Sequence, residues 1–566
     1  MRFILLAAQR ASGLLIILFT FMLHTALGAG PAGAAESRSG GPDEIGLLRR
    51  QVEAQQEQID QLRRQMEEQR KTLEMMSRWL TVNASPDAAA IPRHDVQVAS
   101  LVPVVATESR VTTLQSQSGT EIRSAQKAAE PQPLSFGIGS VQITPVGWID
   151  LTAYARKGNV GSGLGTNFAA VPFDDTVNGN LHETRLTAQG TRMGFRLDAP
   201  VRGARLLGYL ETDFNGFSPG NAAVTSNSNS LRVRLAWVEL GYRKLSVLGG
   251  QSWSLLTPNR KGLSPLPADV FSGMQIDPNH HVGLPWGRVP QFRLTYRPAS
   301  TFSMGLSLES PEQYIGGSAG AGTTTLPSQL AVLYAGQLNN GVTNFSTPTA
   351  SPDVIAKVAV DRSAGGRPLH FEAAGLLRRF RVHNPLTSTS FGSTGGAGSA
   401  NLSFEPVKNL RFLFNSLYSD GGGRYLFGLG PDLIIQGDGS PSLVRAYSTI
   451  DGFEFQAGRR TSLYGYYGGT YFQKNTAIDP ADSKLVGYGY SGSPPNHNRA
   501  VQQITFGVSH TFWRDPQLGG LQFNTQYSYV LRHPWDPPAR QPGSAQANAL
   551  YLNLRYLLPG APPQSK

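Results

Sequence analysis

Residues 291–309 read QFRLTYRPASTFSMGLSLE and contain two runs in which apolar and polar residues alternate. In the first run, Phe292, Leu294 and Tyr296 alternate with Gln, Arg and Thr, and residues 302–309 repeat the pattern after a short PAST segment. A period of two residues is typical of a β-strand with one apolar face and one polar face. The stretch therefore predicts two antiparallel strands joined by a short turn.

The same period recurs from residue 141 to the end of the chain. The predicted strands are 141–157, 183–198, 204–214, 231–242, 245–256, 289–298, 302–311, 353–362, 369–382, 396–405, 410–419, 446–458, 462–473, 499–513, 519–532 and 548–558. The connections between them alternate between long and short, as in outer-membrane barrels, which have short periplasmic turns and long external loops. Alternation alone would also fit an antiparallel sheet with one wet face. We predict an all-β fold, a 16-stranded antiparallel transmembrane β-barrel over residues 135–558, with both chain ends on the periplasmic side.

The segments at the two ends have other compositions. Residues 1–35 have early arginines, an apolar run and then small residues, which predicts a signal peptide. A retained membrane anchor is the alternative, but the apolar run is short for a bilayer. Residues 559–566 read PGAPPQSK and predict a C-terminal tail beyond the last strand. Many outer-membrane barrels end instead on an aromatic residue. The chain has no cysteine, which excludes disulfides and attachment through an N-terminal Cys.

Residues 44–80 carry apolar side chains at alternating spacings of three and four, which predicts a left-handed coiled coil interrupted by Gln55 and Gln69. Its core positions are Ile45, Leu48, Val52, Ile59, Leu62, Met66, Leu73, Met76 and Leu80. An amphipathic helix lying on its own domain is the alternative, but the flanking positions are nearly all Arg, Glu and Gln. Residues 81–134, rich in Ala, Ser, Gln, Thr and Pro, predict a flexible linker. We expect the coiled coil to hold several copies of the barrel together in the periplasm.

Strand parity predicts which charged side chains face the lumen. Arg232 and Arg234 oppose an apolar face that includes Leu235 and Trp237. The same reasoning directs six further side chains inward: Arg192, Arg196, Glu211, Asp213, Arg293 and Arg297. Arginine binds carboxylate and phosphate through a planar fork of donors, and the formal net charge is +11. We therefore expect small anionic solutes as partners. Nucleic acid is not expected, because the chain is predicted to be exported and has no run of Lys or Arg residues. The alternative is that these arginines only solvate the wall.

The long connection at 257–288 is the third external loop of the predicted barrel. If it folds into the lumen, a constriction is lined by Arg260, Lys261, Asp277, His280 and His281. The loop could equally pack against the axis between the copies of the barrel, or against the outer rim. We predict no metal and no cofactor, because the His pair lies in a Pro-rich loop. Residues 316–320, GGSAG, match G-x-S-x-G only within a Gly/Thr loop, so we predict no catalytic residue and no enzyme.

Three segments carry a resemblance to a known family: 210–216 (LETDFNG), 231–241 (LRVRLAWVELG) and 247–254 (VLGGQSWS). They resemble stretches of the DcaP-type trimeric porins, Gram-negative outer-membrane channels with an N-terminal coiled coil and a 16-stranded barrel. The resemblance implies a homotrimer surrounded by outer-membrane lipid, with inward arginines that handle dicarboxylate-type anions during passive diffusion. The phosphate-selective porins share this design and are the alternative. A β-rich surface binding protein or an outer-membrane enzyme is the competing class.

Overall fold

The computed structural model describes residues 134–217, 229–267, 276–318, 320–341, 347–536 and 542–560. The predicted signal peptide, the predicted coiled coil, and nearly all of the predicted linker lie outside these residues, as does most of the predicted tail. Within the described residues, no helix is long and apolar enough to cross a membrane.

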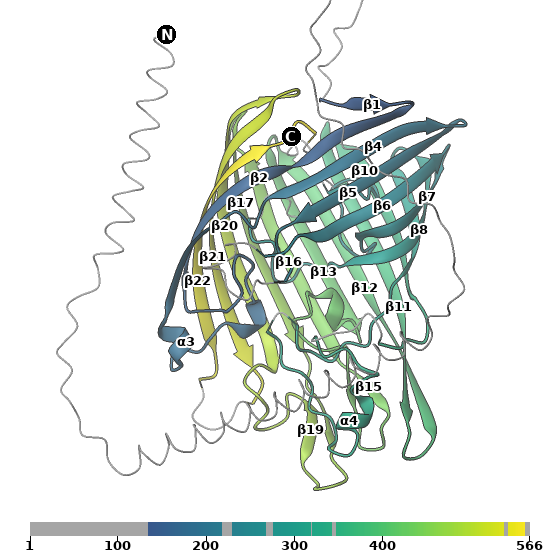
Figure 1. Ribbon diagram of the computed structural model, residues 1–566, viewed down its shortest axis with the longest axis vertical. Coiled ribbons are helices and arrows are strands. Elements are labelled where there is room, and N and C mark those ends of the chain that lie inside the picture. The colour runs from purple at the N-terminus through teal and green to yellow at the C-terminus, as the bar shows by residue number, and fades with distance from the viewer. Residues whose placement is uncertain are drawn as a thin grey trace, which may run out of the picture. The chain divides into compact units, whose positions relative to one another are not determined.

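The strands form one closed antiparallel ring of 16 strands (Figure 1). Its members are β2 (Val141–Lys157), β3 (His182–Thr187) with β4 (Arg192–Val201), β5 (Ala204–Asp213), β6 (Arg232–Tyr242), β7 (Leu245–Trp253), β8 (Arg288–Ala299), β9 (Phe302–Glu309), β10 (Asp353–Ala364), β11 (Arg367–Asn384), β12 (Thr389–Val407), β13 (Leu410–Asp420), β16 (Arg445–Gln456), β17 (Thr461–Phe472), β20 (Asn498–Asp515), β21 (Gly519–Pro534) and β22 (Ala545–Leu557). β3 and β4 are two halves of one ring position, since both pair with β2. β22 also pairs with β2, which closes the ring and confirms the predicted fold.

The other elements are short. They are β1 (Phe136–Ile138), η1 (Phe168–Ala170), α3 (Val177–Asn180), α4 (Ala331–Tyr334), η3 (Gly423–Tyr425), β14 (Leu433–Ile435), β15 (Pro441–Leu443), β18 (Asn475–Ile478) and β19 (Leu485–Tyr488). Apart from β1, they belong to the long connections, and α4, β15 and β19 lie together at one end of the barrel (Figure 1). At the other end the strands are joined by tight turns, such as those after Val201 and Tyr242.

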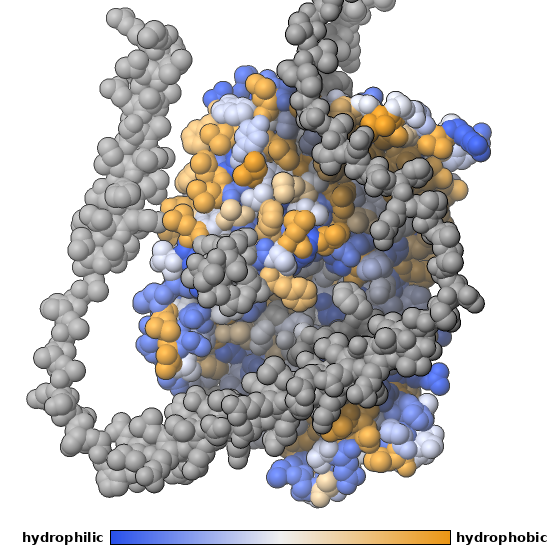
Figure 2. Space-filling model, viewed as in Figure 1, coloured by the Kyte–Doolittle hydropathy of each residue, from blue (hydrophilic) through white to orange (hydrophobic). Residues whose placement is uncertain are grey.

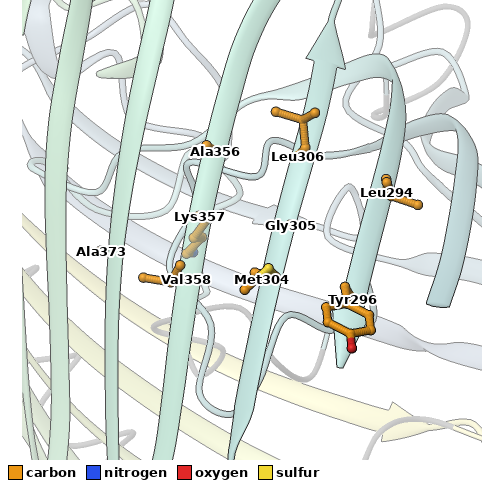
Figure 3. Close-up of a pocket in the computed structure, with 9 residues that line it drawn as sticks. All are labelled: Leu294, Tyr296, Met304, Gly305, Leu306, Ala356, Lys357, Val358 and Ala373. Atoms are coloured by element: carbon orange, nitrogen blue, oxygen red, sulfur yellow. The ribbon is translucent and has the colours of Figure 1, made fainter. Parts of the chain in front are cut away.

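The outer face of the wall is apolar. Phe292, Leu294, Met304 and Leu306 expose between 39% and 53% of their surface, and hydrophobic residues are frequent on the upper part of the visible face in Figure 2. A shallow apolar groove of about 340 Å³ crosses β8–β11 on this face (Figure 3). Lys357 lines it only with its stem, because its Nζ donates to the carbonyl of Thr257 at 2.8 Å. Such a face is suited to a hydrocarbon environment.

A β-bulge in β6 changes the predicted parity of that strand. Glu211 of β5 pairs with Leu235 and Thr212 pairs with Val233, which leaves Arg234 as the extra residue. Both Arg234 and Leu235 are therefore buried, and from there on the inward positions shift by one. The prediction that Leu235 and Trp237 face outward is wrong: Trp237 is 3% exposed and stacks on Tyr209 at 5.7 Å between ring centroids.

The interior of the barrel is not uniformly polar. Leu235 and Trp237 belong to a buried apolar cluster that also contains Val146, Leu248, Leu284 and Ile450. A second cluster joins residues of the long connections, among them Phe168, Leu256 and Leu429, to inward residues of the wall. The long connections therefore fold back into the barrel and pack there through apolar side chains.

Candidate permeation site

Charged side chains gather on the inner face of β4, β5 and β6. Arg234 donates from Nε to Glu211 Oε1 and from Nη1 to Asp213 Oδ2, both at 2.7 Å. Arg232 Nε donates to Asp213 Oδ1 at 2.7 Å, and Arg192 Nη1 lies 3.9 Å from Glu211 Oε1. The structure thus brings five of the sequence-predicted residues together in one cluster.

Arg288, the first residue of β8, adds a charge that sequence reasoning missed. Its guanidinium carbon lies 5.2 Å from the ring centre of Trp286 and 5.7 Å from that of Trp253. Its Nη1 is buried and donates no hydrogen bond to any described residue. The predicted strand began one residue later, at 289, so parity was never applied to Arg288. With Arg192, Arg232 and Arg234 it gives four guanidinium groups beside two carboxylates.

His280 completes this group from the loop between β7 and β8. Its ring packs edge-on against Trp286 and Trp253, with centroids 4.9 and 5.3 Å apart. Burial, and then the nearby charges of Arg234 and Arg192, hold the pKa of His280 well below its ordinary value, so the ring is neutral. Within the described residues, five buried polar atoms at this place lack a hydrogen-bond partner: Arg234 Nη2, Arg288 Nη1, His280 Nε2, Trp253 Nε1 and Trp286 Nε1. Mostly donors, they suit a ligand that accepts hydrogen bonds.

The other three predicted arginines lie outside the cluster. Arg196 donates to both carboxylate oxygens of Asp198, at 2.7 and 3.2 Å. Arg293 is buried and donates to Gln291 Oε1 at 3.0 Å and to the Trp253 carbonyl at 2.5 Å. Arg297 donates to Ser246 Oγ at 2.8 Å. Arg196 and Arg293 therefore have their hydrogen-bond partners on the wall itself.

The described parts of the loop between β7 and β8, residues 254–267 and 276–287, lie inside the barrel, and the predicted residues separate into different environments. Arg260 forms a bidentate pair with Glu454 of β16, with Nη2–Oε1 at 2.6 Å and Nη1–Oε2 at 2.7 Å. Lys261 lies instead at the short-turn end, where it lines a cavity of about 430 Å³ with Arg297 and Asp361. The charge of Arg260 is therefore paired, whereas Lys261 and Arg297 place basic groups at that mouth.

Asp277 and His281 fix the loop in place. Asp277 accepts from the Thr166 and Asn279 amides at 3.1 and 2.9 Å, and burial raises the pKa of its carboxyl. His281 Nδ1 lies 2.8 Å from the Val282 carbonyl oxygen, and burial lowers the pKa of the ring to about 4. Among the described residues no group of three His, Asp or Glu side chains could hold a metal ion.

Close backbone contacts and a buried lysine bind this loop to two separate parts of the wall. On one side, Lys357 Nζ lies 2.8 Å from Glu372 Oε2 and donates to the loop carbonyl of Thr257 at 2.8 Å. On the other side, a Cβ on Gly283 would lie 1.9 Å from the Thr449 carbonyl oxygen, and a Cβ on Gly468 would lie 1.8 Å from that of Val282. Glycine at both positions therefore lets the loop press against β16 and β17, so that the loop crosses the lumen.

The fold and this interior define the class of structure as a closed 16-stranded antiparallel β-barrel whose long connections fold inward. The chain is similar to the outer membrane channel DcaP of Acinetobacter baumannii, with a TM-score of 0.53 and 19% identity over 75% of this chain and 100% of that chain. This similarity confirms, for the fold, the resemblance found in the sequence. More distant are an anion-selective porin from Comamonas acidovorans, with TM-score 0.40 and 11% identity over 74% of this chain and 99% of that one, and OmpT of Vibrio cholerae, with TM-score 0.38 and 9% identity over 75% and 99%. No protein-family model and no curated protein matches the sequence.

Proposed function

We propose that the protein is an outer-membrane porin, a water-filled channel for passive diffusion of small solutes that prefers anions of the dicarboxylate type. The observation that carries the proposal is the cluster of four guanidinium groups beside two carboxylates on the inner wall. Guanidinium groups stay charged at all physiological pH values, so the lumen attracts anions there. A dicarboxylate can engage two arginines at once, which favours it over a monocarboxylate of equal size.

The proposed assembly is a homotrimer. The apolar outer face supports a barrel in contact with outer-membrane lipid, and the coiled coil predicted at 44–80 would join the protomers on the periplasmic side. β2 begins at the short-turn end, because Gln142 pairs with Asp198, close to the tight turn between β4 and β5. In the proposed orientation the short-turn end faces the periplasm and the long connections face the outside of the cell, as in outer-membrane barrels generally.

Liposome swelling tests the proposed function. Proteoliposomes are placed in isotonic solutions of a dicarboxylate, a monocarboxylate of similar size, inorganic phosphate, a neutral sugar and an organic cation. We expect the dicarboxylate to enter fastest among the charged solutes and the cation slowest. Fastest entry of phosphate would favour the phosphate-selective alternative, and a lack of swelling with every solute would contradict a diffusion channel.

A further inference from the structure

A row of tyrosines crosses the outer face of three neighbouring strands near their long-loop ends. Tyr418 of β13 pairs in register with Tyr447 of β16, which pairs with Tyr471 of β17. The three side chains are 57%, 44% and 41% exposed. Exposed aromatic residues at one level on the outside of a barrel mark the boundary between hydrocarbon and lipid headgroups.

A polar notch opens directly beyond this row. β13 ends at Asp420 and β16 begins at Arg445, and these two residues pair in register two positions past Tyr418 and Tyr447. The strand ends leave a cavity of about 440 Å³, lined by both residues, by Lys474 and by neutral polar groups such as Ser442 and Asn475. The notch therefore lies at the level expected for lipid headgroups, with an aromatic surface beneath it.

Cations predominate at the notch. Arg445 has 58% of its side chain exposed and lies 3.8 Å from Asp420, so this pair is solvated and open to a competing anion. Lys474 and Arg499 lie over the ring of Trp535 at 5.7 and 5.8 Å, and that ring packs edge-on against Tyr471 at 6.1 Å. Both cations are thus held next to the tyrosine row, and Asp420 is the one acidic residue among the described residues that line the notch.

We propose that this basic notch, lined by Arg445 and Lys474 and flanked by Arg499 and Trp535, binds the phosphate group of a lipid in the outer leaflet. Arginine and lysine provide charge-assisted donors for phosphate oxygens. The acyl chains of the same lipid would lie along the outer wall past Tyr447. The choice of leaflet rests on the proposed function, because it requires the long connections to face the cell exterior.

Native mass spectrometry of the full-length protein in neutral detergent tests the proposal. The protein is titrated with phosphatidic acid, with phosphatidylcholine and with inorganic phosphate. We expect phosphatidic acid to bind most tightly, and Arg445→Ala combined with Lys474→Ala to weaken it at least about tenfold. Asp420→Asn should tighten the binding, an effect that damage to the fold would not produce. Arg459→Ala, at an exposed turn at the opposite end of the barrel, is the matched control and should bind like wild type.

Two results would overturn the proposal. Unchanged phosphatidic acid binding by the double variant would place the lipid elsewhere, and inorganic phosphate binding as tightly as the lipid would indicate a site for soluble anions. Conductance in planar bilayers separates this proposal from the proposed function, since the double variant should conduct like wild type. Lipid binding that follows these variants in a protein that never conducts would refute the channel and leave the lipid site standing.

Discussion

Replacing Arg288 with glutamine should reduce anion selectivity without disturbing the ion pairs of the wall. Arg288 stacks between two tryptophans and forms no ion pair with a described residue, so its loss leaves no carboxylate without its partner. Arg232 and Arg234 are less suitable, because both hold Asp213. The variant thus removes one charge from the cluster of four guanidinium groups.

The size of the effect follows from Coulomb's law. One charge acting on a permeating ion at about 8 Å in water contributes roughly 0.5 kcal/mol, and the narrow, partly apolar lumen offsets part of the screening by salt. An energy of about 0.5 kcal/mol changes the anion concentration roughly twofold in one direction and the cation concentration roughly twofold in the other. The anion-to-cation permeability ratio should therefore fall about four- to fivefold.

Reversal potentials across a planar bilayer under a KCl gradient measure this ratio. Arg379→Gln is the control, because Arg379 is an exposed residue of β11 directly after the buried, inward Arg378. We expect the control to match wild type and Arg288→Gln to shift toward zero. Equal shifts in both variants, or none in Arg288→Gln, would refute the assignment of Arg288 to the permeation site.

Four further predictions follow from the loop, the wall and the N-terminal segment. Gly283→Val should push the loop off β16, which should raise the single-channel conductance and lower the melting temperature. The control Gly398→Ala, where a Cβ meets nothing within 4 Å, should change neither quantity. A conductance unchanged by Gly283→Val would argue against a loop that limits the pore. Lys357→Met should destabilise the barrel by about 3 kcal/mol in urea unfolding, because it removes the amine that pairs with the buried Glu372 and leaves that carboxylate only His370 Nε2, at 3.2 Å, as an ion-pair partner among the described residues. The combined change with Glu372→Leu should recover part of that loss. Burial lowers the pKa of His281 in the folded state to about 4, so between pH 4 and about 6.5 the unfolded state binds one proton more than the folded state. The contribution of His281 to the free energy of unfolding should therefore be full above pH 6.5 and fall by roughly 3 kcal/mol by pH 4. His281→Gln should show a smaller slope of melting temperature against pH. Deletion of residues 45–80 should leave a foldable barrel with a lower trimer yield in unheated gel electrophoresis, and an unchanged yield would assign the segment another role.

Much of the barrel could be predicted because its wall repeats one local rule. The alternation at 141–157 gave the bounds of β2 without error, and most other strands agree within a few residues. The β6 bulge broke that rule, since one inserted residue reverses every later position and no sequence period announces it. Trp237 was consequently assigned to lipid, although it packs inside.

The permeation site was predictable only in part. The inward position of Arg192, Arg232 and Arg234 follows from strand alternation. Arg288 lies at the junction of a loop and a strand, where the alternation has not yet begun and cannot say which way a side chain points. The pairing of Arg260 with Glu454 joins residues 194 positions apart and depends on the path of the loop through the lumen. Sequence periodicity describes the strands and contains no information on that path.

The most direct test of an anion-preferring channel is the sign of the wild-type reversal potential under a KCl gradient, measured at several salt concentrations. We expect the reversal potential to have the sign that indicates chloride selectivity. The selectivity should be strongest in dilute salt and should weaken as the Debye length falls below about 10 Å. Addition of a dicarboxylate should reduce the chloride current more than a monocarboxylate of equal size. A cation-selective wild type, or a selectivity that does not respond to salt, would contradict the account.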